Sequence, residues 1–180
     1  MVDATITHLR GRGFGRIIAA GPGAASLGED ADDSDVYAFT AKVHDPAQRA
    51  KLLNNLIDAH RGEWLLVCFN GEFFFHPFCD TRSVRDLIEF MWSERRDAVM
   101  NYAIDLYNDD MTGEAFNREM AYFDAEGWYG FERGEKLADV YGGLGWRFEE
   151  FTPRDMSRVN RPALFWADPA VPIRGDLWFE

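Results

Sequence analysis

The 180-residue sequence has little cysteine: Cys68 and Cys79 are the only two, and no Cys-x-x-Cys pair exists. Two cysteines in an acidic chain are typical of a reduced intracellular protein, and a disulfide between them is not expected. No apolar run approaches the roughly 20 residues that a membrane-spanning helix needs, and no long apolar core follows the first basic residues as in a signal peptide. We therefore expect a cytoplasmic protein without a transmembrane segment.

Clusters of basic residues are also missing. Lys and Arg number 19 against 31 Asp and Glu, which gives a formal net charge of −12. Such a chain repels phosphate backbones unless a basic patch overrides its net field. Nucleic acid is therefore not an expected partner, whereas the acidic bias is compatible with binding of cations.

The motifs of common hydrolases and of phosphate-binding loops are absent as well. The sequence contains no Gly-x-Ser-x-Gly, no His-Glu-x-x-His and no P-loop. Gly11, Gly13 and Gly15 precede an expected strand, whereas glycines that cradle a phosphate follow a strand and open a helix. The acidic stretch 28–35 is similar to a calcium loop but has Asp35 where that loop needs glycine, so we expect a solvated loop.

What the chain does have is apolar and aromatic material for one folded domain spanning residues 1–180. Hydrophobic residues make up 47% and aromatic residues 15% of the chain. Apolar periodicity, the helix start at Asp45 and Pro46, and the turn residues predict alternating strands and helices. The expected strands are 14–20, 36–43, 64–68 and 98–108 with a late one within 158–169, and the expected helices are 45–61 and 81–97 after an initial helix end.

Strands that alternate with helices at this spacing predict βαβ units with right-handed crossovers. The expected fold class is therefore α/β, with a mostly parallel sheet flanked by helices. From Asp109 onward, aromatic pairs and glycines predict a loop-rich C-terminal part, either a lid or acceptor surface or an irregular edge.

Polar residues follow the strand 64–68, and ligands of parallel α/β sheets bind beyond the carboxyl ends of strands. Glu72, His76 and Asp80 are spaced four apart, which is compatible with metal or phosphate-side ligands. The structural alternative is that Glu72 caps a turn, His76 packs among aromatic rings and Asp80 is the N-cap of the next helix. Arg82 is either a surface residue or a phosphate ligand.

Two further groups of residues could carry chemistry. Asp105 interrupts an apolar strand, so it is either a functional acid or hydrogen-bonded in the structure. In the segment 142–151, Trp146 could stack on a sugar, Arg147 could contact phosphate, and Glu149 or Glu150 could act as general base. The alternative for this segment is a β-turn followed by an exposed acidic edge.

The stretch 64–110, WLLVCFNGEFFFHPFCDTRSVRDLIEFMWSERRDAVMNYAIDLYNDD, resembles a branch of the bacterial family 2 glycosyltransferases. In that branch a strand ends in an Asp-x-Asp-Glu-Phe motif, followed by a Pro-x-Cys-Asp-Thr-Arg-like turn, a helix and a strand near "IDLY". The segments 123–134, 142–150 and 160–167 also look like that branch, so the likeness extends from about Gly13 to Leu177.

The resemblance implies a GT-A, Rossmann-like fold that binds a nucleotide-diphosphate sugar with a divalent cation, Mn or Mg, and transfers the sugar to an acceptor. The metal motif falls on Phe69, Asn70, Gly71 and Glu72, so both aspartates are replaced and only Glu72 remains as metal ligand. The expected donor-binding residues are Asn70, Gly71, Glu72, Asp80, Arg82 and Arg147, and the expected catalytic bases are Glu149 and Glu150.

Two main hypotheses follow from this degenerate motif: a glycosyltransferase, active or inactive, and a non-catalytic glycan- or protein-binding module on the same scaffold. An acid-rich hydrolase built on Glu72, Asp80 and Asp105 is a third hypothesis. The family's first strand is expected upstream of Met1, and the sheet edge left without it would favour a homodimer.

Overall fold

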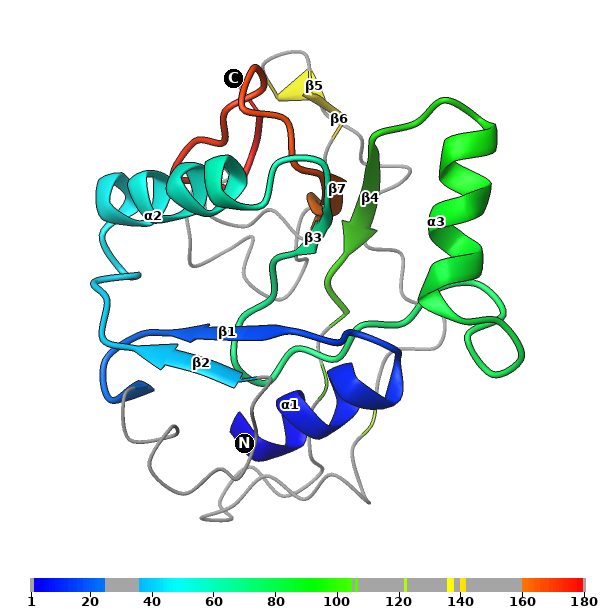
Figure 1. Ribbon diagram of the computed structural model, residues 1–180, viewed down its shortest axis with the longest axis horizontal. Helices are drawn as coiled ribbons and strands as arrows, with labels where there is room; N and C mark the ends of the chain where they lie inside the picture. Colours follow the sequence, from blue (N-terminus) through cyan, green and yellow to red (C-terminus); the bar gives the residue numbers. More distant parts are fainter. Residues whose placement is uncertain are drawn as a thin grey trace. The chain divides into compact units, whose positions relative to one another are not determined.

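The computed structural model describes residues 2–24, 36–104, 106, 122, 136–137, 140–141 and 160–179 (Figure 1). The chain divides into two compact units, Met1–Val99 with Pro162–Glu180 and Met100–Arg161. Its elements are α1 (Val2–Gly11), β1 (Ile17–Ala20), β2 (Val36–Phe39), α2 (Pro46–Ala59), β3 (Trp64–Leu66), α3 (Val84–Ser93), β4 (Ala98–Tyr102), β5 (Lys136–Leu137), β6 (Val140–Tyr141) and β7 (Asn160–Trp166). No helix in these ranges is long and apolar enough to cross a membrane.

The start of α2 confirms the helix signal in the sequence. Asp45 is the N-cap, and its Oδ1 accepts hydrogen bonds from the backbone N–H groups of Ala47 at 2.9 Å and Gln48 at 3.1 Å. Pro46 occupies the first helical position, where its missing N–H is no loss. The helix ends at Ala59, before Gly62 turns the chain toward β3 with a φ of 83°.

The sheets differ from the expected mostly parallel one. Among the described residues β1 and β2 pair in parallel, but β7 pairs antiparallel with β3 and lies between β3 and β4. β3 and β4, which α3 connects, point in the same direction in Figure 1 and are separated by β7. The fold is therefore mixed α and β, and a mostly parallel GT-A-like sheet is not found in the described part. The alternation of strands and helices reflects local sequence patterns. The strand that separates β3 from β4 is β7, which comes from the C-terminal part of the chain.

β7 is the centre of the larger unit because both of its faces are covered. Leu164 is fully buried in a cluster with Leu9, Ile17, Phe74 and Val84. Its neighbour Phe165 points to the other face, as successive residues of a strand do, and is buried in a second cluster with Ile57, Ala167 and Ile173. One strand thus joins two apolar cores.

The C-terminal segment after β7 is fixed to α2 by side-chain hydrogen bonds. The Arg49 guanidinium donates to the carbonyl of Gly175 and, at 2.9 Å, to that of Val43. Asn54 exchanges two hydrogen bonds with the backbone of Ile173, each 2.9 Å long. The bonds to Gly175 and Ile173 join residues more than a hundred positions apart in the sequence.

Gly175 lies close against Pro46 of α2, so we expect Gly175→Ala to be destabilising. An added Cβ would lie 2.7 Å from Pro46 Cβ and closer still to the Pro46 carbonyl group. Overpacking of this kind costs about 1–3 kcal/mol. Urea unfolding of Gly175→Ala would measure the loss. Gly15→Ala is the matched control, because its new Cβ meets nothing within 4 Å; equal effects of the two substitutions would contradict the close approach.

Candidate functional site

The residues between β3 and α3 form the candidate site, and we call the segment 69–82 the aromatic loop. It has no regular helix or strand and carries five phenylalanines. Phe74 is buried at 7% exposure and anchors the loop in the core cluster of Leu164. Three others, Phe69, Phe75 and Phe78, are 42%, 61% and 74% exposed. Three exposed phenylalanines within one loop make the loop a candidate interaction surface.

α1 and the turn after it hold the aromatic loop through three polar side chains. The Thr5 hydroxyl accepts a hydrogen bond from the backbone N–H of Gly71 at 3.0 Å, and the His8 ring bonds the Phe74 carbonyl through Nε2 at 2.8 Å. Arg12 Nη1 donates to the Cys79 carbonyl at 2.7 Å. Thr5 and His8 share one face of α1, and Arg12 follows in the turn after the helix, so these side chains hold the loop at three points.

The same face packs against aromatic rings of the loop. The His8 ring meets Phe73 edge-on with centroids 5.3 Å apart and meets Phe75 at 5.1 Å. The guanidinium carbon of Arg12 lies 5.0 Å from the centroid of Phe75, within cation–π range. Thr5, His8 and Arg12 were not predicted as site residues, because their hydrogen-bond partners are backbone atoms far along the chain.

Glu72, the expected metal ligand, has a structural partner. Its Oε2 accepts a hydrogen bond from the Phe69 backbone N–H at 2.7 Å, and its own N–H donates to the Phe69 carbonyl at 3.0 Å. Gly71 completes this turn with a φ of 90°, a value that favours glycine. Of the two interpretations of Glu72, the turn cap is the one that this geometry matches. Asn70 lies exposed at the tip of the turn.

The next turn presents Phe78 to solvent. Phe78 has a left-handed φ of 63°, which is uncommon for a residue with a Cβ. Its carbonyl accepts hydrogen bonds from the backbone N–H groups of Thr81 at 2.9 Å and Arg82 at 2.7 Å, and these bonds stabilise the turn. Asp80 and Arg82 are both exposed in this turn.

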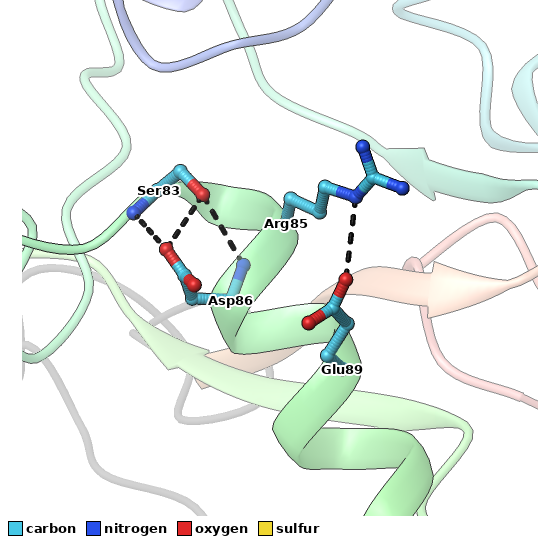
Figure 2. Close-up of polar contacts among 4 residues, drawn as sticks. All are labelled: Ser83, Arg85, Asp86 and Glu89. Carbon is cyan, nitrogen blue, oxygen red and sulfur yellow. Dashed lines mark hydrogen bonds and ion pairs between the residues drawn. The ribbon is translucent and has the colours of Figure 1, made fainter.

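The expectation that Asp80 caps α3 is wrong. Ser83 is the N-cap: its hydroxyl accepts from the Asp86 backbone N–H at 3.2 Å, while Asp86 Oδ2 accepts from the Ser83 N–H and hydroxyl at 2.7 Å each (Figure 2). Asp80 precedes Ser83 by three residues and lies in the turn before the helix, too early to reach the first free N–H groups. The hydrogen bonds from Ser83 hold the pKa of Asp86 below its usual range.

We expect Ser83→Ala to cost about 1 kcal/mol of stability at neutral pH, as loss of an N-cap does. The substitution also removes the largest cause of the lowered Asp86 pKa, so that pKa should rise.

A lowered folded-state pKa stabilises the protein above the unfolded-state pKa, and the contribution disappears as the pH falls through the folded-state value. Urea unfolding between about pH 2 and pH 7 should therefore show the effect of Asp86→Asn only at the higher pH. An Asp86→Asn effect that is the same at both ends would contradict the assignment.

No group of three or more His, Cys, Asp or Glu side chains among the described residues is placed to hold a metal ion, and Glu72 already accepts a backbone hydrogen bond. Four residues with expected roles lie outside the described residues, so those roles stay predictions: Asp105, Arg147, Glu149 and Glu150. His76, the remaining candidate, is half-buried, packs against Phe74 at 5.9 Å and bonds the Pro77 carbonyl through Nδ1 at 3.0 Å.

No family model, no curated protein and no solved structure matches the chain. Function is therefore inferred from the aromatic loop and its supports.

Proposed function

We propose that the chain is a non-catalytic binding module that takes a neutral glycan on the aromatic loop. The observation that carries this proposal is Phe78, 74% exposed on a left-handed backbone that two hydrogen bonds to its carbonyl stabilise. Exposing a benzyl group and holding an unfavourable φ both cost free energy, and such strain concentrates at ligand-contacting sites. Contact with a ligand would remove the benzyl group from water and so recover the free energy that its exposure costs.

The central stretch of the aromatic loop carries little charge, which supports a neutral ligand. Between Phe73 and Cys79 the chain has no carboxylate and no lysine or arginine, and His76 is the one titratable side chain besides the thiol. The net charge of −12 works against polyanionic ligands. A glycan offers apolar ring faces to phenylalanine and hydroxyl groups to the exposed Asn70 and Arg82.

The contacts that hold the loop in place support binding of a ligand to a preformed surface, rather than closure of the loop over the ligand. The side chains of Thr5, His8 and Arg12 form hydrogen bonds with the backbone of the loop, and the buried Phe74 side chain fixes the loop to the hydrophobic core. A surface organised before binding loses less conformational freedom when the ligand arrives. The loop is thus suited to recognition.

Isothermal titration with soluble cello-, malto- and chito-oligosaccharides tests the proposal. Binding should be indifferent to EDTA and should weaken by about tenfold or more in Phe78→Ala, as at an aromatic hot spot. Glu72→Gln should keep binding, because the amide oxygen can still accept from the Phe69 N–H. Phe90→Ala on α3 is the matched control, being a phenylalanine 56% exposed outside the loop. Absence of binding across the panel, or binding lost with EDTA, would refute the module.

Sugar transfer is the second candidate function. Glu72 lies in the turn after β3, at the position of the retained glutamate in the motif that this chain resembles. Titration with UDP- and GDP-sugars in the presence and absence of manganese tests it. Heat that requires manganese and disappears in Glu72→Gln would favour the transferase, and absence of heat would exclude an active enzyme for these donors.

A further inference from the structure

Arg12 contacts the aromatic loop at two points that lie before and after Phe78 in the sequence. Its Nη1 donates a hydrogen bond to the carbonyl of Cys79, the residue directly after Phe78, at 2.7 Å. Its guanidinium carbon lies 5.0 Å from the ring centroid of Phe75, three residues before Phe78. Phe75 and Phe78 are 61% and 74% exposed. One half-buried arginine thus contacts the part of the loop that presents two exposed rings.

The way α1 ends holds the backbone of Arg12 in place. The backbone N–H of Gly13 donates to the Arg10 carbonyl at 2.9 Å, and that of Phe14 donates to the Leu9 carbonyl at 3.2 Å. Together with the left-handed φ of Gly13, 96°, these two bonds form the Schellman motif that ends many helices. Arg12 is the C-cap of this motif, where its positive charge is favourable near the last carbonyl groups of the helix. Its side chain therefore extends from a fixed backbone.

The two contacts of Arg12 depend on the chemistry of a guanidinium group. This planar group can lie against the Phe75 ring and still direct an N–H in its own plane to the Cys79 carbonyl. A lysine ammonium has no flat face, and its single nitrogen would have to serve both contacts. Arginine is therefore the cationic residue that suits this position.

Taking the proposed glycan binding as the basis, we infer that Arg12 is a positioning residue of that site and that Phe75 is a second ring of it, in addition to Phe78. Arg12 fixes the Phe75 ring directly and the turn that carries Phe78 through the Cys79 carbonyl. Side chains that are ordered before binding do not have to be ordered by the ligand, and such ordering costs affinity.

Isothermal titration of Arg12 variants with cello-, malto- and chito-oligosaccharides tests the proposal. Arg12→Ala should weaken binding about fivefold or more, because the ligand then has to order two rings. Arg12→Lys, which keeps the charge but not the planar group, should bind more weakly than the wild type and more tightly than Arg12→Ala. Arg16→Ala, at an exposed arginine four positions further on, is the matched control and should bind as the wild type does. Circular dichroism checks that each variant is folded.

A double-mutant cycle distinguishes positioning of the ring from a general loss of stability. In a Phe75→Leu background the cation–π contact is already gone, so Arg12→Ala should weaken binding less than it does in the wild type. Phe75→Leu alone should also weaken binding, because it removes a ring that contacts the ligand. Equal effects of Arg12→Ala in the two backgrounds, or an unchanged affinity of Phe75→Leu, would overturn the proposal.

Limited proteolysis without a ligand separates the role of Arg12 from glycan binding itself. Chymotrypsin cleaves after phenylalanine, and cleavage of a native protein follows the population of locally open states. Arg12→Ala should therefore be cut faster after Phe75 and Phe78 than the wild type and Arg16→Ala. Faster cutting in a protein that binds no glycan would refute the binding module but keep Arg12 as the residue that fixes the rings. A wild type that binds a glycan no better than Arg12→Ala does would keep the module and overturn the role of Arg12.

Discussion

Replacing Phe165 with alanine is expected to lower the free energy of unfolding by about 3–5 kcal/mol, the range for truncation of a buried phenylalanine. Phe165 is 1% exposed in the middle of β7. It packs against Ile57 of α2 and Ile173 of the C-terminal segment, and meets the Phe179 ring edge-on at 5.5 Å. The substitution therefore opens a cavity where three separate parts of the chain meet.

Urea unfolding followed by tryptophan fluorescence measures this loss, since Trp166 is the next residue. Natural domains have about 5–15 kcal/mol of stability, so the variant should unfold at a clearly lower urea concentration. Phe90→Ala is the control: Phe90 is 56% exposed, and surface substitutions usually change stability by less than about 0.5 kcal/mol. If the two variants lost equal stability, the position of Phe165 between α2 and the C-terminal segment would be wrong.

The helices were predictable from local signals because those signals act within one turn. Asp45 followed by Pro46 predicted the start of α2, and the structure confirms both roles. For α3 the sequence analysis considered Asp80 as the cap, whereas the structure has Ser83 as the N-cap. The decisive signal was the acid three residues after Ser83, since Ser83 and Asp86 form a reciprocal capping box that Asp80 cannot form.

The order of strands was not predictable because it depends on pairing between distant residues. β7 begins close to Pro162, and proline in a strand favours an edge position. In the structure β7 is nevertheless central, and its later residues, Leu164 to Trp166, pair with β3. The ladder bond that joins β7 to the start of β4 comes from the Trp166 N–H to the Asp97 carbonyl at 2.7 Å. The pairing with β3 and this bond to β4 both involve residues beyond Pro162, so the missing N–H of the proline removes neither.

The candidate site was only partly accessible from the sequence. The sequence directed attention to the segment after β3, and the turn-cap alternative for Glu72 agrees with the geometry. It did not indicate that α1 holds the loop, since the contacts of Thr5, His8 and Arg12 end on backbone atoms 66 to 67 residues away. Any residue type supplies those backbone partners, so no motif in the loop reveals them.

Asn54→Ala is expected to lower the free energy of unfolding by about 2–4 kcal/mol, because it leaves two backbone groups of Ile173 without partners. Ile173 is 1% exposed, so water cannot replace the lost hydrogen bonds, and each unsatisfied buried group costs about 1–3 kcal/mol. The amide of Asn54 is suited to this position because it donates to the Ile173 carbonyl and accepts from its N–H. Thermal or urea unfolding of the variant measures the loss.

Two further variants separate the hydrogen bonds from the helix position itself. Asn55→Ala, at the exposed neighbour in α2, changes helix propensity in the same way and should be nearly neutral or slightly stabilising. Asn54→Asp keeps the acceptor for the Ile173 N–H but turns the donor into a carboxylate oxygen facing the Ile173 carbonyl. That contact is repulsive, so Asn54→Asp should be at least as destabilising as Asn54→Ala at neutral pH and should recover stability in acid, where a protonated carboxyl can donate. An Asn54→Asp variant as stable as the wild type at neutral pH would show that the bond donated by Asn54 contributes nothing to fixing the C-terminal segment to α2.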